Sequence, residues 1–284
     1  MLKTIVAVAL CALAIPAPRQ TAATVRVGYC TRLNALDATK TAGFDYAELS
    51  ATEIAQLTDE EFEATVTRLK ALGLPTPAAN LFIPQTIHLT GPDTKPDEQM
   101  AHVKKVVSRL SRLGTQIIVF GSGGARRVPE GFSKDEAFKQ LVDFGRRAAR
   151  EARPYGITIT IEPLRKQETN IINSAAEGLD LVNAIDDPNF QLMIDFYHLA
   201  SEHEDPEIVL RAREHIRHLH MANPQGRVIP QKWEEFDYAP FFANLRAIGY
   251  DKRISVEVSG TPDLPGQAPA AIALLRRAFT ESAR

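Results

Sequence analysis

Apolar, β-rich segments alternate along the chain with segments of amphipathic helical pattern, and the joint between them recurs. Five times a helical pattern ends at a glycine and an apolar segment follows; these glycines are Gly43, Gly73, Gly114, Gly156 and Gly249. Glycine commonly takes the left-handed conformation just past the end of a helix. The pattern therefore predicts a chain in which helix and strand alternate.

Eight apolar segments are predicted as strands. Five of them, FDYAEL, LPTPAANLF, TQIIVF, ITITIE and YDKRISVEV, follow those glycines, and the others are VRVGYC at 25–30, FQLMIDF at 190–196 and IRHLHMA at 216–222. Each is followed by enough residues for a helix. Helix starts are marked at Thr58, Ser133 and Ser174, each of which has a glutamate three residues later, the spacing of a capping box.

Strict alternation of strand and helix favours a parallel sheet, and eight such units are the number that closes a barrel. We therefore predict an α/β fold of one domain, a (β/α)8 TIM barrel. An open doubly wound sheet is the alternative. It is disfavoured because no Gly-x-Gly-x-x-Gly motif follows the first predicted strand.

The first two dozen residues have a different character from the rest. Lys3 precedes an apolar segment from Ile5 to Ile15, and PAPRQTAAT, which is rich in small residues, follows it. A positive start, a short apolar core and a small-residue exit are typical of a secretory signal, and this core is too short to span a bilayer. A first barrel strand or a buried helix is the alternative interpretation.

We therefore expect residues 1–23 to be a signal segment and residues 24–284 to form the barrel domain. The protein would then be exported, to the periplasm or the medium; without a functional signal it would be cytoplasmic. Cys11 would leave with the signal, so Cys30 would have no partner for a disulfide within the mature chain.

Composition and charge narrow the range of partners. The chain has 284 residues, of which 44% are hydrophobic and 24% charged, and its formal net charge is −2. These values are those of an ordinary globular protein without a basic stripe or a polybasic patch. We therefore expect neither a nucleic-acid partner nor stable membrane insertion, whereas a homo-oligomer is compatible with the composition.

Ligand-type side chains occupy inward-facing positions near the ends of the last four predicted strands. In ITITIE the isoleucines face the helices, which turns Glu162 inward, and in RISVEV the same alternation turns Glu257 inward. Parity also turns Asp195 and His220 inward. All four lie at the C-terminal ends of their strands, the face where barrel active sites are built.

Three carboxylates and an imidazole inside one barrel mouth would be electrostatically costly without a cation. A mostly oxygen donor set with one imidazole suits Mn²⁺, Mg²⁺ or Co²⁺ with positions left open for substrate. We expect one divalent ion, Mn²⁺ before Mg²⁺ or Co²⁺, held by Glu162, Asp195, His220 and Glu257. The alternatives are four unrelated polar residues, and for Asp195 a simple helix cap.

The second half of the chain resembles the xylose isomerase-like TIM barrels, also called the sugar phosphate isomerase/epimerase family, and its tagatose 3-epimerase-like members in particular. The resemblance lies in ITITIEPLRKQETNIINS, LMIDFYHLA, HLHMAN and GYDKRISVEVSG. It implies the same four metal ligands, and substrate contacts by Glu168 and His198. The family usually has an arginine six residues beyond the histidine; Arg227, seven beyond His220, is the third expected substrate contact despite this shift.

Three functions fit these observations. The first is a metal-dependent isomerase or epimerase of a keto-sugar or related polyol, in which Glu162 and Glu257 remove and return a proton beside the carbonyl. The second is a lyase or dehydratase on a 3-keto-sugar or inosose, which begins with the same proton abstraction and then expels a leaving group. The third is a secreted, non-catalytic sugar-binding barrel, which would not need the two glutamates.

A fourth function, an endonuclease of the same barrel superfamily, is disfavoured. Those enzymes resemble this chain in its second half but hold three metals with histidines from the third and fourth strands. The corresponding segments here, PAANLFIP and QIIVFGSGG, contain no histidine, and His88 lies beyond the third strand. We therefore expect a small-molecule carbohydrate substrate.

Overall fold

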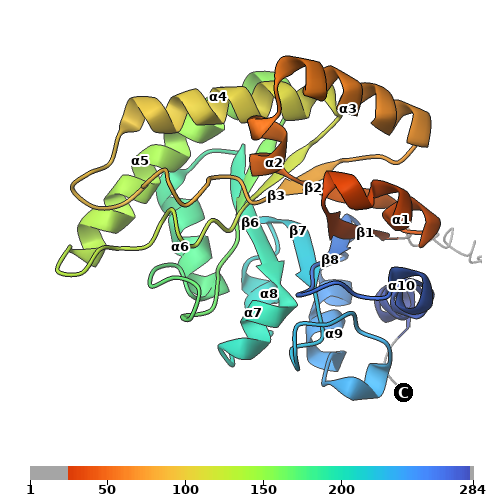
Figure 1. Cartoon of the computed structure of the whole chain (residues 1–284). Helices are drawn as coiled ribbons and strands as arrows, with labels where there is room; N and C mark the ends of the chain where they lie inside the picture. Colours follow the sequence, from red (N-terminus) through yellow and green to blue (C-terminus); the bar gives the residue numbers. More distant parts are fainter. Residues whose placement is uncertain (1–24, 282–284) are drawn as a thin grey trace, which may run out of the picture.

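Eight parallel strands close into a barrel in chain order in the computed structural model, which describes residues 25–281 (Figure 1). The expected signal at residues 1–23 lies outside the described residues. The strands are β1 (Arg26–Thr31), β2 (Tyr46–Ser50), β3 (Ala78–Asn80), β4 (Ile117–Phe120), β5 (Thr158–Ile161), β6 (Phe190–Asp195), β7 (Ile216–Met221) and β8 (Arg253–Val256).

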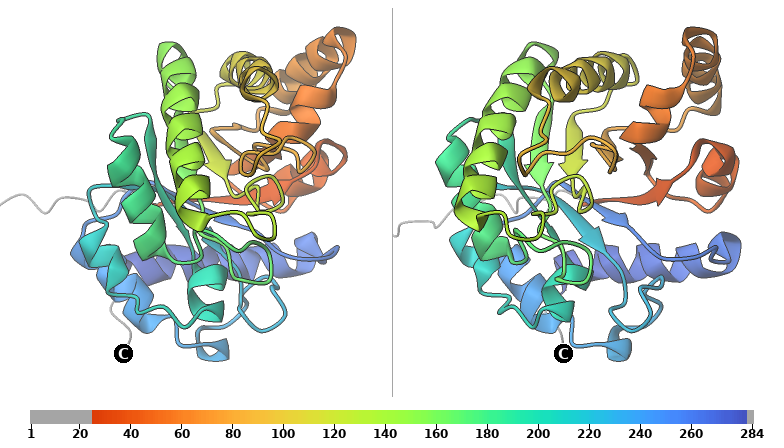
Figure 2. Two further views of the ribbon diagram at one scale, coloured as in Figure 1. Left: turned by 90° about the vertical axis from the view of Figure 1, so that its left-hand side faces the viewer. Right: turned by 60° about the vertical axis from the view of Figure 1, so that its left-hand side comes forward.

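Helices cover the outside of this barrel, as the turned views in Figure 2 show. The α-helices are α1 (Leu36–Thr41), α2 (Ala51–Gln56), α3 (Asp59–Leu72), α4 (Pro96–Arg112), α5 (Lys134–Ala152), α6 (Ala175–Ile185), α7 (Phe196–Ser201), α8 (Ile208–Arg211), α9 (Ala239–Ala247) and α10 (Leu264–Thr280), and the 3₁₀ helices are η1 (Leu33–Ala35), η2 (Arg153–Tyr155) and η3 (Trp233–Glu235). None of the helices between residues 25 and 281 is both long and apolar enough to cross a membrane.

The predicted fold class is confirmed, and β1 closes the ring by pairing in parallel with β8. The third strand is much shorter than the segment LPTPAANLF suggested. Pro75 and Pro77 lie in its first half, and a proline has no N–H to donate to a neighbouring strand. Only Ala78–Asn80 therefore pairs with β2 and β4.

Local capping explains where the helices begin and end. The Thr58 hydroxyl accepts from the N–H of Glu61 while the Glu61 carboxylate accepts from the N–H of Thr58, so the full capping box forms at α3. Ser133 and Ser174 accept the equivalent backbone bonds at α5 and α6. The five joint glycines all have positive φ, as the pattern predicted; Gly73, for example, has φ 60°.

The apolar part of the barrel interior is small, because most of the hydrophobic core lies between the strands and the helices. The interior cluster consists of Tyr46, Ala78, Ile117, Val119 and Met193. Above it, toward the C-terminal ends of the strands, the inward-facing residues are polar. The barrel therefore supports a polar site on a narrow apolar base.

Gly28 on β1 makes room for the aromatic ring in that base. A Cβ added at Gly28 would lie 2.2 Å from Cε2 of Tyr46, so any side chain there would displace the ring. Tyr46 reaches across the interior, where its hydroxyl hydrogen-bonds with Oγ of Ser255 at 2.8 Å. This pair links the apolar base to the polar layer above it.

Candidate active site

Four ligand-type side chains converge at the C-terminal mouth of the barrel from four successive strands. Glu162 directly follows β5, Asp195 ends β6, His220 lies near the end of β7, and Glu257 directly follows β8. One ligand atom of each lies within 4.8 Å of the others. Glu162, Asp195 and His220 are buried, and Glu257 is partly buried. The structure thus brings together the four residues that strand parity singled out.

The donor atoms of this cluster fit a divalent cation. Among the described residues, Oε1 of Glu162, Oδ2 of Asp195 and Nδ1 of His220 are buried and have no hydrogen-bond partner. Nδ1 of His220 lies 3.2 Å from Oε1 of Glu162 and 3.4 Å from Oε2 of Glu257. Buried polar atoms are nearly always paired, so three unpaired ones that converge are a chemical fit for an ion held by oxygen and imidazole donors.

The two oxygens of the Asp195 carboxylate have different surroundings. Its Oδ1 accepts a 2.8 Å hydrogen bond from the N–H of Tyr197, which caps α7, and its Oδ2 is left to face the cluster. A helix cap and a metal ligand, which the sequence presented as alternatives for Asp195, are therefore compatible, because they would use different oxygens of one carboxylate. Burial raises the pKa of Asp195 to about 7, against the opposing effect of the Arg227 charge.

Glu162 is held in place by its neighbours on the β4 side. A Cβ at Gly121, just past β4, would lie 2.3 Å from Oε2 of Glu162, so a side chain there would displace this carboxylate oxygen. The buried guanidinium of Arg126 donates to the carbonyl of Glu162 at 2.7 Å. Burial raises the pKa of the Glu162 carboxyl. Burial acts in the same direction on Glu257, but the charges of His220 and Arg227 outweigh it and lower the pKa of that carboxyl.

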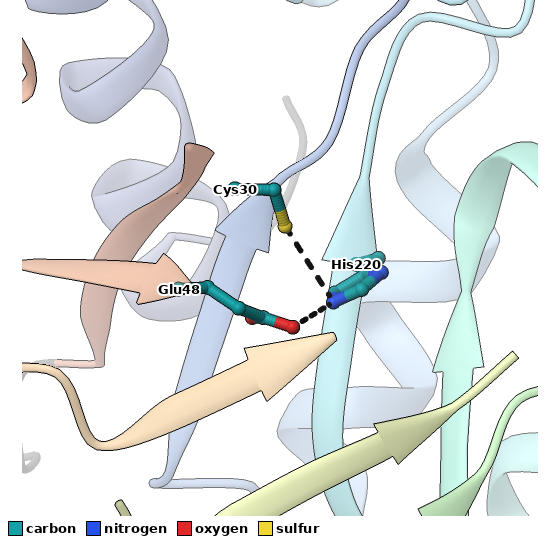
Figure 3. Close-up of side chains that lie close together, drawn as sticks. All are labelled: Cys30, Glu48 and His220. Atoms are coloured by element: carbon teal, nitrogen blue, oxygen red, sulfur yellow. Dashed lines mark hydrogen bonds and ion pairs between the residues drawn. The ribbon is translucent and has the colours of Figure 1, made fainter. Parts of the chain in front are cut away.

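His220 is oriented from below by a buried carboxylate that the sequence analysis did not identify. Oε1 of Glu48, on β2, lies 2.9 Å from Nε2 of His220, and the two side chains point toward one another in Figure 3. With Nε2 bound to Glu48, Nδ1 faces the cluster. Burial disfavours the imidazolium, but the charge of Glu48 outweighs this effect and raises the pKa of His220 above its usual value.

Glu48 belongs to a hydrogen-bonded network in the barrel interior. Its Oε2 lies 2.7 Å from Nε2 of His218 and accepts a hydrogen bond from the hydroxyl of Ser255, and Ser255 in turn meets Tyr46. All of these side chains are buried. His218 is fully buried in this network. Both oxygens of Glu48 are therefore engaged, and His220 is the link between the network and the site.

Cys30 also approaches this network, because its Sγ lies 3.8 Å from Nε2 of His220 (Figure 3). Cys30, Glu48 and His220 are close enough to resemble a second set of metal ligands. Their facing atoms, however, are bound to one another. Burial, followed by the charge of Glu48, raises the pKa of the Cys30 thiol, which keeps it protonated. We therefore interpret this group as structural support for His220.

The three residues expected to contact substrate line the same mouth. The guanidinium of Arg227 forms an ion pair with Glu257 and lies 3.6 Å from Oδ2 of Asp195 and 3.6 Å from Oε1 of Glu168. Its carbon lies 4.7 Å from the centre of the Tyr197 ring. Although Arg227 lies one residue later than the family pattern, its backbone has φ 51° and brings the side chain to the site.

His198 faces the cluster as a neutral hydrogen-bond donor. Its Nδ1 accepts from the N–H of Arg165 at 3.3 Å, which assigns the ring proton to Nε2. Nε2 lies 3.5 Å from Oδ2 of Asp195 and 4.0 Å from Oε2 of Glu168. Burial, reinforced by the charge of Arg227, lowers the pKa of His198 to about 3. A donor beside carboxylates suits the recognition of a sugar oxygen.

A cavity of about 570 Å³ opens above the cluster and is hereafter called the site cavity; its lining includes Glu162, Glu168, Arg227 and Glu257. Its volume falls within the range of small-molecule pockets, about 300–1,000 Å³. Three glycines of the GSGG turn after β4 also line it. The arrangement combines carboxylates from strands three places apart around the ring with a cationic side chain in one accessible pocket. The buried imidazole of His198 lies beside this pocket, next to Asp195 and Glu168.

Comparison with known proteins gives matches over most of the chain. A family model described as xylose isomerase-like TIM barrel matches residues 36–278. Among curated proteins, an L-ribulose 3-epimerase from Methylomonas sp. (strain DH-1) is 30% identical over 122 residues, which are 43% of this chain and 40% of that protein. The chain therefore spans well under half the length of the first curated relatives that it matches.

Two solved structures share the fold. A D-allulose 3-epimerase from Methylomonas sp. superposes with a TM-score of 0.79 at 22% identity, over 90% of this chain and 98% of that one. A 3-keto-D-glucoside 4-epimerase from E. coli gives a TM-score of 0.72 at 21% identity, over 89% of this chain and 99% of that one. At such identities the likeness demonstrates the fold alone.

Proposed function

Because the chain belongs to the xylose isomerase-like TIM barrel family, we propose that its barrel mouth is the active site of a divalent-metal-dependent isomerase or epimerase of keto-sugars. The observation that carries this proposal is the convergence of three unpaired buried donor atoms, from Glu162, Asp195 and His220, on one point beside Glu257. The names of the curated relatives, ketose 3-epimerases among them, support the same class of reaction.

The proposed metal ligands are Glu162, Asp195, His220 and Glu257. A divalent ion bound there would polarise the substrate carbonyl and make the neighbouring C–H more acidic. The oxygen-rich donor set favours Mn²⁺, with Mg²⁺ and Co²⁺ as alternatives. His220 keeps its proton on Nε2, against Glu48, and so presents Nδ1 as the donor.

The proposed proton-transfer pair is Glu162 and Glu257. Strands β5 and β8 lie three places apart around the ring, so the two carboxylates approach the cluster from different sides. A sugar between them would present opposite faces of one carbon to the two carboxylates, as removal and return of a proton in an epimerisation require. Arg227 and Glu168 line the site cavity, where they would bind and orient the hydroxyls of the substrate. His198 would donate a hydrogen bond from its place beside Asp195 and Glu168.

Incubation of the metal-loaded protein in D₂O with free keto-sugars, 3-keto-glycosides and inososes tests the proposal. Deuterium uptake at the carbon beside the carbonyl, with the substrate otherwise intact, is the expected result. Loss of water or of an aglycone would instead identify a lyase or dehydratase. Binding of sugars without any exchange would identify a non-catalytic barrel.

Export of the protein is a separate proposal, which rests on the composition of the first 23 residues alone. N-terminal sequencing of the protein from its native host tests it. Cleavage between about residues 17 and 23 is expected. A soluble protein that retains Met1 would contradict it.

A further inference from the structure

A second cavity adjoins the site cavity at the barrel mouth. Its volume is about 670 Å³, and we call it the side cavity. It lies between the end of β1 with α1 on one side and the loop from β8 to α10 on the other, and α1 and α10 lie next to each other in Figure 1. Of the four proposed metal ligands, only Glu257 lines it. Each cavity alone has the size of a pocket for one small ligand.

The two cavities are adjacent, and the residues that line both of them form the divide between them. They share five lining residues, Arg32, Ser50, Asn80, Leu81 and Glu257. The centre of the divide is a hydrogen bond of 2.9 Å from Nδ2 of Asn80 to Oε1 of Glu257. The other oxygen of Glu257 faces the metal-ligand cluster. A molecule bound at the cluster therefore lies directly beside the side cavity.

The walls of the side cavity combine apolar faces with unused polar groups. The apolar lining includes Ala35, Ala38, Val258, Pro262 and Leu264. At the rim, the side chains of Arg32, Asn34 and Thr261 make no hydrogen bond or ion pair with any residue in the range 25–281, and all three are exposed. A sugar ring has the matching character, because its faces carry C–H groups and its edge carries hydroxyls.

We propose that the substrate is a keto-disaccharide, whose keto ring occupies the site cavity and whose second sugar ring occupies the side cavity. This inference rests on the proposed function, since it assigns the keto ring to the metal-ligand cluster. The glycosidic bond would cross the divide at Asn80 and Glu257. A free monosaccharide fills the site cavity alone and leaves Asn34 and Thr261, which line only the side cavity, without a ligand.

The test compares one keto ring with and without a second ring. Deuterium exchange is measured with 3-keto-glucose, with a 3-keto-glucosyl disaccharide and with an aryl 3-keto-glucoside, and kcat/KM is determined for each. The disaccharide is expected to exceed free 3-keto-glucose by about tenfold or more, which corresponds to about 1.4 kcal/mol. Equal values, or a preference for the aryl glycoside over the disaccharide, would overturn the inference and leave the proposed function standing.

Variants that fill the side cavity test whether the preference for the disaccharide arises there. Ala38→Trp on α1 and Thr261→Trp on the opposite wall introduce a large side chain at exposed positions, so the core is not disturbed. Each is expected to reduce the ratio of kcat/KM for disaccharide over monosaccharide by about tenfold. The matched control is Ala101→Trp, an exposed alanine on α4 outside both cavities, which leaves the ratio unchanged.

An equilibrium measurement separates the inference from catalysis. Calorimetric titration of the metal-loaded protein with the unoxidised disaccharide and with glucose is expected to show tighter binding of the disaccharide, and Ala38→Trp is expected to remove the difference. No difference in the wild type would overturn the inference. Absence of exchange with every keto compound would overturn the proposed function as well.

Discussion

The carboxylate of Glu48 and the imidazole of His220 form a fully buried pair, with 2.9 Å between Oε1 and Nε2. A carboxylate that holds the far nitrogen of a ligand histidine fixes the tautomer and the orientation of the ring. Glu48 is itself fixed by His218 and Ser255. The direction of His220 Nδ1 is thus determined by residues that do not reach the site cavity.

Removal of this support is expected to weaken metal binding. Loss of such outer carboxylates typically costs about 10 to 100-fold in metal affinity, so Glu48→Ala should show a loss of that size by chelator competition. Glu48→Gln keeps one acceptor for Nε2 and should lose less. Glu53→Gln, a carboxylate on α2 that accepts from the N–H of Leu33, is the control. Equal affinity in Glu48→Ala and wild type would refute the positioning role.

One divalent ion per chain is expected from elemental analysis of the purified protein. His220→Ala should lose the ion, because the variant removes the imidazole donor from a set of four. The control is His102→Ala on α4, where the histidine contacts the carbonyl of Phe82 at 2.8 Å and belongs to none of the metal-ligand groups found among residues 25–281. Two or more tightly bound ions, or full loading of His220→Ala, would be incompatible with the proposed ligands.

Replacement of either proton-transfer carboxylate should reduce turnover more than binding. Glu162→Gln and Glu257→Gln, measured at saturating metal, are expected to lose about 10²- to 10⁴-fold in kcat while they still bind a substrate analogue. Glu136→Gln, which removes an exposed partner of Lys139 on α5, should retain full activity. Near-normal turnover in either site variant would mean that this glutamate is a ligand only.

Asp195 is expected to make the metal-free protein less stable as pH rises. An unfolded aspartate ionises near its ordinary pKa of about 3.9, whereas burial raises the folded pKa of Asp195 to about 7. Between these values the folded state binds the extra proton, so the free energy of unfolding falls as pH increases and levels off above pH 7. The neutral variant Asp195→Asn lacks this loss.

Urea unfolding in the presence of a chelator from pH 4 to 8 measures the effect as a difference between the two proteins. The free energy of unfolding of Asp195→Asn should rise relative to that of wild type as pH increases through this window, by an amount on the order of a few kcal/mol at most. With added metal, wild type should be the more stable of the two proteins, because only wild type retains the carboxylate. Parallel pH profiles without metal would contradict the raised pKa.

Strand parity was sufficient to predict the four metal-ligand candidates because barrel strands alternate strictly between interior and helices. The same rule, applied to FDYAEL, would have turned Glu48 inward beside Tyr46. That signal was present and was not used. Glu48 lies deeper in the barrel than the C-terminal strand ends, where barrel active sites are built. Its role depends on contacts with β7 that no local sequence pattern indicates.

The loops were less predictable than the strands. Arg227 reaches the site because its own backbone adopts φ 51° directly after Gly226, a conformation that its spacing from His220 does not indicate. The side cavity is likewise formed by segments far apart in sequence, the turn after β1 and the loop after β8. Such features depend on how loops fold back on the barrel.

Gly28 lies on β1, and its lack of a side chain matters for His220 on β7, two places away around the barrel. Even an alanine there would push the Tyr46 ring from its place, and with it the contacts that run through Ser255 and Glu48 to His220. In a mutational screen, a change at this position would appear as a protein that folds but no longer retains its ion. The residues on which the proposed metal site depends therefore include one at the base of the barrel, away from the site cavity.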